Sequence, residues 1–434
     1  MKDLIAQNIE ELDFNDVDNL IWSAVFSSKE ETRNKAKEMI FLKGLQHGVV
    51  PSSIQNFYDA MGRGEVHSIT VPAVNIRGLT YYAARAIFRS AMKNNVGLII
   101  FEIARSEIGY TYQSPSEYTA NIIAAALREG FYYPIFLQGD HFQVNKKNFE
   151  KNHKEEIDTL KNLIKESINA GFFNIDIDAS TMVDYSKKTL KEQQKENFTL
   201  TAMFTDYIRG LQPDGITVSV GGEIGHIGGK NSTVEEFEAF MEGYLKTLNS
   251  QKGISKISVQ TGTAHGGIPL KDGTLAQVKL DFNVLKSIGS LAQEKYGLSG
   301  AVQHGASTLP MELFDKFPES YTSEIHLATG FQNTMYDLAP DWLKKEIYQY
   351  LQEKCKEEWK QDMTYEQFIY KTRKKGFGPF KKQWWSLPED IKNAIMDELS
   401  KTFDVIFEKL RVKDSIQLVN KYINPVNVSL KFLQ

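Results

Sequence analysis

The sequence predicts an α/β fold, a (β/α)8 TIM barrel with a helical extension at each end. Two observations lead to this prediction. Short β-rich apolar runs alternate with longer segments of helical period, and eight such units complete a barrel without remainder. A doubly wound open sheet would show the same alternation, so the count of eight favours closure. The runs span residues 68–76, 96–104, 134–139, 172–177, 215–222, 254–262, 298–303 and 323–328.

The segments between these runs have the spacing of amphipathic helices. Examples are "TYYAARAIFRSAMKN" after the first run, "SEYTANIIAAALREG" after the second, "KEEIDTLKNLIKESINAG" after the third and "TVEEFEAFMEGYLKTLN" after the fifth. Each strand therefore has a helix candidate to carry the chain back to the start of the next parallel strand.

The chain divides into three predicted segments. Residues 1–67 form a helical N-terminal extension, residues 68–335 the barrel, and residues 336–434 a helical C-terminal extension. The barrel segment is close to the ~250 residues typical of this fold. We expect Trp384 and Trp385 to pack the C-terminal extension onto the barrel or onto another subunit.

Composition excludes several classes of protein. Hydrophobic residues make up 41% and charged residues 24% of the 434, and the net charge is -4, which gives no reason to expect nucleic acid or an anionic membrane as partner. The single cysteine, Cys355, rules out an intrachain disulfide framework. No apolar run approaches the roughly 20 residues of a membrane helix, and the first residues do not read as a signal peptide. We expect a cytoplasmic protein.

Polar residues gather at the ends of the predicted strands, where barrels of this class place their active sites. Four of the eight histidines lie at such ends, and three imidazoles from different strands with one open position are typical of catalytic zinc. A metal held there would polarise a carbonyl group. The strand-end residues are Asn75, Glu102, Asp140, His141, Asp178, Glu223, His265, His304 and His326.

The acidic residues in this set have more than one interpretation. Asp140 beside a metal could move a proton on the substrate. Glu223 and Asp178 could orient the imidazoles or bind the metal themselves. Asp178 could instead cap the next helix and Glu223 could serve a turn. A lone histidine at a strand end is also more often structural, so it is the shared placement that favours a metal site.

Glycines and hydroxyl residues follow two of the histidines, in "HGG" and "HGAST". Such turns leave backbone N–H groups open to an anion, as in barrel phosphate sites near strands seven and eight. Gly266, Gly305, Ser307 and Thr329 are the phosphate-binding candidates, although ordinary strand-to-helix turns would explain the same pattern. A phosphorylated carbonyl substrate would account for both the metal and the phosphate site.

The motifs "GDH", "IDAS", "GEIG…GG", "AHGG…VKLDF" and "QHGAS", in this order, resemble the zinc-dependent class II fructose- and tagatose-bisphosphate aldolases. The resemblance covers about residues 68–330. It implies that Asp140 is catalytic, that Glu223 and Asp178 lie beside the metal, and that Gly266, Gly305 and Ser307 bind phosphate. The implied zinc ligands are His141, His265 and His304.

The chemistry implied by this resemblance is reversible aldol cleavage of a ketose bisphosphate such as fructose 1,6-bisphosphate. Zinc or another divalent metal would bind the ketose oxygens and stabilise an enediolate, and Asp140 would take and return the C4 hydroxyl proton. The resemblance also implies a monovalent cation as second cofactor and a place in glycolysis and gluconeogenesis. The aromatic, helical C-terminal extension favours a homo-oligomer.

Several positions depart from the family pattern, including the loop "FEIARSE", which has no clear counterpart of a family serine. His326 stands where the family has a substrate-contacting asparagine, and Gly330 stands where it has an aspartate. Asn231 occupies the place of a proton-transferring glutamate, for which Glu235 or Glu236 could substitute. His326 is therefore predicted to contact substrate in a pocket that differs from that of the fructose bisphosphate enzymes.

A second resemblance keeps other functions open. "FEIARSEIGYTYQSPSEY", "LQGDHFQVN" and "AGFFNIDIDAST" are similar to the non-catalytic companion subunit of tagatose-bisphosphate aldolase. A metal-dependent lyase or isomerase for another phosphosugar is a further alternative. The complete histidine set favours an active aldolase.

Overall fold

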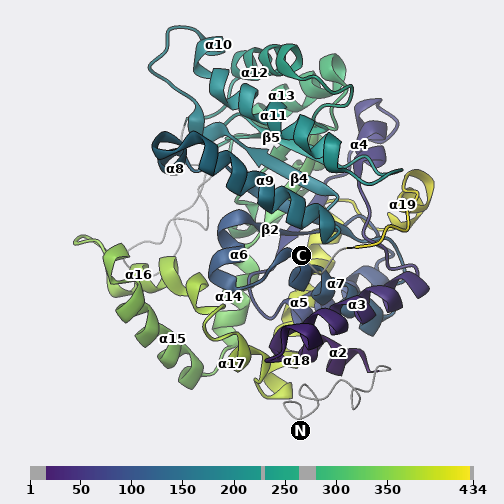
Figure 1. The fold of residues 1–434 in the computed structure, drawn as a ribbon, viewed down its shortest axis with the longest axis vertical. Helices are drawn as coiled ribbons and strands as arrows, with labels where there is room; N and C mark the ends of the chain where they lie inside the picture. Colours follow the sequence, from purple (N-terminus) through teal and green to yellow (C-terminus); the bar gives the residue numbers. More distant parts are fainter. Residues whose placement is uncertain (1–15, 226–229, 263–279, 431–434) are drawn as a thin grey trace.

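The computed structural model describes residues 16–225, 230–262 and 280–430. Eight parallel strands form a closed barrel in sequence order (Figure 1). Strand β1 pairs with β8, with Val71 opposite Glu324 and Val74 opposite Leu327, so the open sheet is excluded and the predicted barrel is confirmed. The strands are β1 (Val71–Asn75), β2 (Ile100–Ala104), β3 (Phe136–Gln143), β4 (Asn174–Asp178), β5 (Ser219–Glu223), β6 (Lys256–Val259), β7 (Ala301–Gln303) and β8 (Thr322–Leu327).

Helices follow the strands and cover the outside of the barrel. They are α5 (Thr80–Lys93), α6 (Arg105–Thr111), α7 (Pro115–Glu129), α8 (Lys146–Lys151), α9 (His153–Asn169), α10 (Leu190–Gln193), α11 (Lys195–Leu211), α12 (Val234–Thr247), α13 (Phe282–Tyr296) and α14 (Thr329–Leu338). Short 3-10 turns lie between them: η2 (Ser180–Met182), η3 (Ala306–Thr308), η4 (Met311–Lys316) and η5 (Pro318–Ser320). Local sequence explains their ends; Ser114 caps α7, Pro115 begins it, and Gly130 ends it with a φ of 72°.

The barrel interior is charged rather than apolar. Side chains from the even-numbered strands meet inside it: Glu102 of β2, Asp176 of β4, Lys256 of β6 and Glu324 of β8, all buried. The intervening residues, such as Ile175 and Ile325, are buried as well and contribute to the apolar layer under the helices. Most barrels of this class fill their interior layers with branched apolar residues.

The N-terminal extension reaches the amino-terminal end of the barrel through its last helix. It contains α2 (Val17–Phe26), α3 (Glu30–Gln46) and α4 (Gln55–Gly62). At the start of α4, the Ile54 N–H donates to Asn174 Oδ1 at the beginning of β4. One turn later, the Tyr58 hydroxyl reaches Glu324 inside the barrel. This extension is therefore part of the barrel's packing.

The C-terminal extension packs mainly against the barrel helices α5, α14 and α6. It contains α15 (Asp341–Lys354), η6 (Lys356–Glu358), α16 (Tyr365–Thr372), η7 (Arg373–Gly376), α17 (Lys381–Trp385), α18 (Glu389–Lys409) and α19 (Ile416–Tyr422). Figure 1 shows α2, α3 and α18 gathered beside α5 and α7.

Two tryptophans fasten this extension to the barrel, as predicted. Trp384 and Trp385 are both buried. The Trp385 ring stacks on Tyr81 of α5 at 6.0 Å between centroids and meets the edge of Trp22 of α2 at 6.4 Å. Both extensions thus share one aromatic cluster with α5, while the predicted homo-oligomer stays a prediction.

Within the described parts of the chain, no helix combines the length and the apolar character that a membrane span requires.

Candidate active site

A bulge in β3 brings two neighbouring polar residues into one cavity. Successive residues of a regular strand point to opposite faces. Here the pairing of β3 with β4 shifts between Gly139 and Phe142, and His141 adopts a left-handed φ of 41°. As a result Asp140 and His141 both line the cavity at the carboxyl ends of the strands. This explains why the chain places an aspartate and a histidine side by side at the end of a buried strand.

Gly139 is needed for this bulge. A Cβ atom at that position would lie 2.5 Å from the ring of Phe142, which folds back over the glycine. The strand also continues to Gln143, past the end at residue 139 predicted from the sequence.

Two carboxylates orient the His141 ring. Its Nδ1 lies 3.1 Å from Glu223 Oε2 and 3.3 Å from Asp178 Oδ2, which directs Nε2 toward Asp140 at 3.7 Å. Asp178 also accepts hydrogen bonds from the backbone N–H and hydroxyl of Ser180. Asp178 therefore contacts the imidazole and also binds the turn after β4, whereas the next α-helix, α10, is capped by Thr189 and not by Asp178. Carboxylates that bind the far nitrogen of a histidine are the usual support for a metal ligand.

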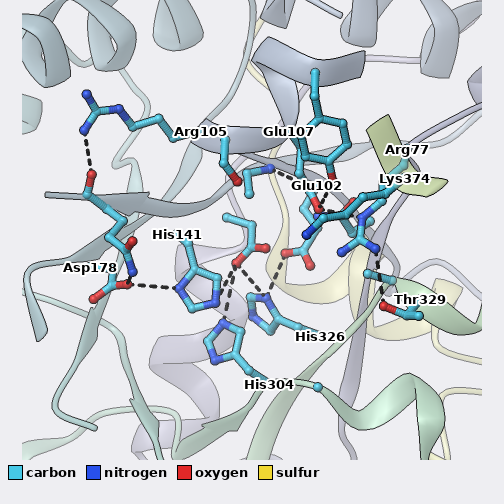
Figure 2. Close-up of a pocket in the computed structure, with 18 of the residues that line it drawn as sticks. Arg77, Glu102, Arg105, Glu107, His141, Asp178, His304, His326, Thr329 and Lys374 are labelled. Atoms are coloured by element: carbon cyan, nitrogen blue, oxygen red, sulfur yellow. Dashed lines mark hydrogen bonds and ion pairs between the residues drawn. The ribbon is translucent and has the colours of Figure 1, made fainter. Parts of the chain in front are cut away.

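Asp140 lies among three imidazoles. Its Oδ1 is 3.5 Å from His304 Nε2, 3.7 Å from His141 Nε2 and 3.1 Å from His326 Nδ1. Figure 2 shows the rings of His141, His304 and His326 gathered close together. Burial acts to raise the pKa of Asp140, but the charges of His141 and His326 outweigh it and keep the pKa well below its usual value. Burial, together with the charge of Asp178, raises the pKa of Glu223 to about 7.

These side chains suit a divalent metal ion. The ligand atoms of Asp140, His141 and His304 all lie within 4.8 Å of one another, and so do those of His141, Asp178 and Glu223. Imidazole nitrogens with carboxylate oxygens are ligands that zinc accepts. The residues present therefore fit the predicted metal. The third predicted imidazole, His265, lies outside the described residues.

A second wall of the cavity, across from Asp140 and His141, is built from the turns after β7 and β8. Gly305 has a φ of 70° and precedes η3, which contains Ser307, while Thr329 is the first residue of α14. Backbone N–H groups at the start of a helix attract anions. Gly330 fits closely here, because a Cβ on it would lie 2.7 Å from the Ser307 carbonyl oxygen. An aspartate at this position would not fit. Gly266 lies outside the described residues.

Two basic side chains join this wall. Arg77, from the turn after β1, lies 3.3 Å from the Thr329 hydroxyl and forms an ion pair of 2.6 Å with Glu107. Lys374, from η7 of the C-terminal extension, also lines the cavity and makes no ion pair with any residue that the structure describes. Burial and the charge of Arg77 lower the pKa of Lys374. Figure 2 shows Arg77, Lys374 and Thr329 grouped together, apart from the histidines.

The match to known protein families agrees with this geometry. The model of the family "fructose-bisphosphate aldolase class-II" matches residues 55–375. The chain belongs to this family. The match begins at α4 and ends within η7, so it includes Tyr58 and Lys374 from the two extensions.

Solved structures with the same fold include aldolases. A provisionally named fructose-1,6-biphosphate aldolase from Coccidioides immitis has 18% identity and a TM-score of 0.52, covering 83% of this chain and 97% of its own. Fructose-bisphosphate aldolase from Campylobacter jejuni has 17% identity and a TM-score of 0.50, and the match covers 85% of this chain and 99% of that one. The YdjI aldolase from Escherichia coli K12 has 12% identity and a TM-score of 0.50, and the match covers 83% of this chain and 98% of that one. At these identities the likeness shows the fold alone. No curated protein matches the sequence.

In this member of the class II aldolase family, one cavity of about 680 Å³ gathers the candidate residues. The eleven that the structure describes all line it: Asn75, Glu102, Asp140, His141, Asp178, Glu223, His304, Gly305, Ser307, His326 and Thr329. Sequence reasoning missed Arg77, Arg105 and Lys374, which line the same cavity. Arg77 follows the strand-end residue Asn75 by two positions, a signal that could have found it. Nothing local to Lys374 marks it.

The glutamates suggested as replacements for the family's proton-transferring residue do not line this cavity. Glu236 accepts a hydrogen bond from the backbone N–H of Thr233 and forms an ion pair of 2.6 Å with Lys230. It therefore caps α12. Glu235 lies next to Glu236 in the first turn of that helix, and Asn231 lies before the helix begins. Neither Glu235 nor Asn231 is among the residues around the cavity.

Proposed function

We propose that this protein is a metal-dependent ketose-bisphosphate aldolase, which cleaves a phosphorylated ketose reversibly to dihydroxyacetone phosphate and an aldehyde. The observation that carries the proposal is the position of Asp140. Its carboxylate lies within 3.7 Å of three imidazoles, on the floor of a cavity whose other wall can bind an anion. Family membership supports the same reaction.

The anion-binding wall selects for a phosphorylated substrate. Gly305, Ser307 and Thr329 offer backbone N–H and hydroxyl groups, and Arg77 and Lys374 add two positive charges beside them. Charge-assisted hydrogen bonds of this kind are roughly twice as strong as neutral ones. A phosphate bound there extends the sugar chain toward Asp140 and the histidines.

The role of Asp140 is to move a proton. As an ionised carboxylate it can accept the proton of the C4 hydroxyl, which allows the C3–C4 bond to break and the aldehyde to leave. The electron pair of that bond stays on the three-carbon fragment, which becomes dihydroxyacetone phosphate by taking up a proton at C3, and Asp140 then releases the proton it accepted. In the condensation direction it returns that proton. His141 and His304, with His265 from the sequence, would hold the metal, whose contribution is to polarise the ketose carbonyl. Asp178 and Glu223 keep the His141 ring in position.

Zinc-reconstituted aldol cleavage tests this function directly. The protein is assayed on fructose 1,6-bisphosphate and tagatose 1,6-bisphosphate, with and without a chelator. We expect cleavage of at least one of them, abolished by the chelator and restored by zinc. Asp140→Asn should lower kcat by about a hundredfold or more while the metal content is unchanged.

The failures are informative. Stoichiometric zinc without cleavage of either sugar would reject these two substrates and point to another phosphosugar, since His326 and Gly330 differ from the family pattern. Neither cleavage nor bound metal would reject the catalytic proposal and favour a non-catalytic partner subunit.

A further inference from the structure

The charged layer inside the barrel is connected to the candidate active site through His326. The ring of His326 faces a carboxylate with each nitrogen: Nδ1 is 3.1 Å from Asp140 Oδ1, and Nε2 is 2.7 Å from Glu324 Oε1. Nδ1 is also 3.1 Å from Glu102 Oε2. His326 is buried, so its orientation is determined by these partners.

Glu324 is the central residue of the layer. Its Oε1 meets three nitrogen atoms, Lys256 Nζ at 2.5 Å, Gln138 Nε2 at 2.7 Å and His326 Nε2 at 2.7 Å. Its other oxygen accepts the hydroxyl hydrogen of Tyr58. The carboxylate is completely buried, so it has little freedom to move without breaking several of these contacts.

Lys256 supplies the positive charge that this carboxylate needs. Its ammonium group also lies 3.0 Å from Asp176 Oδ2 and 2.8 Å from Gln138 Oε1, and the side chain is 1% exposed. The neighbouring strand makes room for it, since a Cβ on Gly221 would lie 2.3 Å from Asp176 Oδ1 and 3.0 Å from Lys256 Cε. The interior is therefore shaped around this ion pair.

We propose that Lys256 and Glu324 are positioning residues for Asp140, acting through His326. Lys256 and Tyr58 place Glu324, Glu324 places the His326 ring, and the ring places the Asp140 carboxylate among the other imidazoles. The assignment rests on the proposed function, because it gives Asp140 its catalytic task. Misplacing a reacting group by about 1 Å can cost around a hundredfold in rate.

A second metal ion is the competing explanation of this cluster. Ligand atoms of Glu102, Glu324 and His326 lie within 4.8 Å of one another, which is close enough for a cation. However, the Lys256 ammonium group already contacts Glu324 and Asp176, so an added metal would meet a like charge in a buried site. We therefore assign the cation of this layer to Lys256.

The test uses the full chain with Glu324→Gln as the main variant. Glutamine keeps the shape, can still accept at one oxygen, and leaves Lys256 paired with Asp176, so this variant should fold. We expect kcat to fall at least tenfold, KM to change less than threefold, and bound metal to stay the same. Lys256→Met should show the same changes in kcat, KM and bound metal if it folds. Tyr58→Phe should lower kcat by less.

Ser219→Ala is the matched control. Ser219 is buried in the barrel and its Oγ lies 2.8 Å from Ser255 Oγ, but it touches neither Glu324 nor His326. It should lower the melting temperature slightly and leave kcat unchanged. An unchanged kcat in Glu324→Gln would overturn the proposal, and so would the loss of a second equivalent of metal in that variant.

Crystal structures provide a readout that does not depend on activity. In Glu324→Gln and Lys256→Met we expect the His326 ring and the Asp140 carboxylate to leave the positions they hold in the parent chain. If both stay in place, the positioning role is wrong even when the aldolase reaction is confirmed. If both move while the parent chain cleaves no ketose bisphosphate, the proposed reaction is wrong and the positioning role stands.

Discussion

At the scale of single residues, the site depends on side chains that orient other side chains. His141 has an unusual backbone conformation, with a φ of 41°, and two carboxylates facing its Nδ1. A backbone conformation of this kind costs of order 1–3 kcal/mol, and the surrounding contacts must offset it. The carboxylates of Asp178 and Glu223 are thus as much a part of the proposed metal site as the imidazoles.

Asp178→Asn should weaken zinc binding about 10- to 100-fold, because the amide no longer offers a charged acceptor to His141 Nδ1. Zinc affinity is measured by competition with a chromophoric chelator. Asp404→Asn, remote from the cavity and paired with Lys93, is the control and should bind zinc like the parent chain. Equal affinities in the two variants would show that Asp178 does not support the ligand.

The residue types at the strand ends were readable from the sequence, whereas their partners were not. An aspartate and histidines at the ends of buried strands are costly unless they have a task, so Asp140, His141 and His304 stood out. Lys256 and Glu324 did not, because "ISKISVQ" and "SEIHLA" also suit strands with one face in water. Only closure of the barrel decides that these charges face inward.

At the scale of elements, the β3 bulge is the feature that sets the geometry of the site. Strand β3 continues four residues beyond its predicted end at residue 139, and the bend between Gly139 and Phe142 cannot be inferred from alternation alone. The glycine before Asp140 is its local signature, since Phe142 packs against the space where a Cβ would be.

Gly139→Ala should lower the free energy of unfolding by roughly 1–3 kcal/mol, the usual cost of overpacking a core. Denaturant unfolding measures this change. The double variant Gly139→Ala with Phe142→Leu should recover part of the loss, because the smaller side chain gives the new methyl group room. Identical losses in the single and double variants would mean that the Phe142 ring is not the obstacle.

The pairing of α5 with α7 has a pH dependence that can be derived. Glu129, at the end of α7, lies 2.6 Å from Arg85 Nε and 2.7 Å from Arg89 Nε. Burial acts to raise the pKa of Glu129, but its hydrogen bonds to the two arginines outweigh this and lower the pKa. The resulting stabilisation is present above the pKa of the unfolded chain and is lost as the pH falls through the lower folded value.

Glu129→Gln should therefore destabilise the protein by about 1 kcal/mol at neutral pH, in keeping with a partly exposed ion pair. The difference from the parent chain should shrink in unfolding curves recorded at successively more acidic pH. Glu38→Gln breaks an exposed pair with Lys35 and should change the stability little at any pH. A Glu129→Gln difference that does not depend on pH would contradict the ion-pair origin.

At the scale of the whole molecule, the two extensions complete the barrel. Tyr58 reaches the barrel interior from α4, and Lys374 reaches the anion-binding wall of the cavity from η7. The sequence predicted helices in both extensions, and the packing of the C-terminal extension onto the barrel or onto another subunit. Their contributions to the interior and to the cavity depend on contacts between segments far apart in the chain, which local patterns do not contain.

Lys374→Met should raise KM for the phosphorylated substrate roughly tenfold with little change in kcat, since a phosphate contact of this kind binds ground state and transition state alike. Steady-state kinetics separates the two constants. Lys371→Met, on an exposed position of α16, is the control and should leave both unchanged. A lower kcat with an unchanged KM would assign Lys374 to the chemical step instead.

The charged interior of the barrel also matters while the chain is being made. Strand β1 leaves the ribosome long before β8, its partner, and the barrel cannot close until β8 has emerged. Slow, long-range pairing of this kind exposes unpaired strands to aggregation. During that interval Glu102, Asp176 and Lys256 are in water, and charges within a strand discourage contact with other nascent chains. The side chains that organise the site in the folded protein thus also help to keep the incomplete chain soluble.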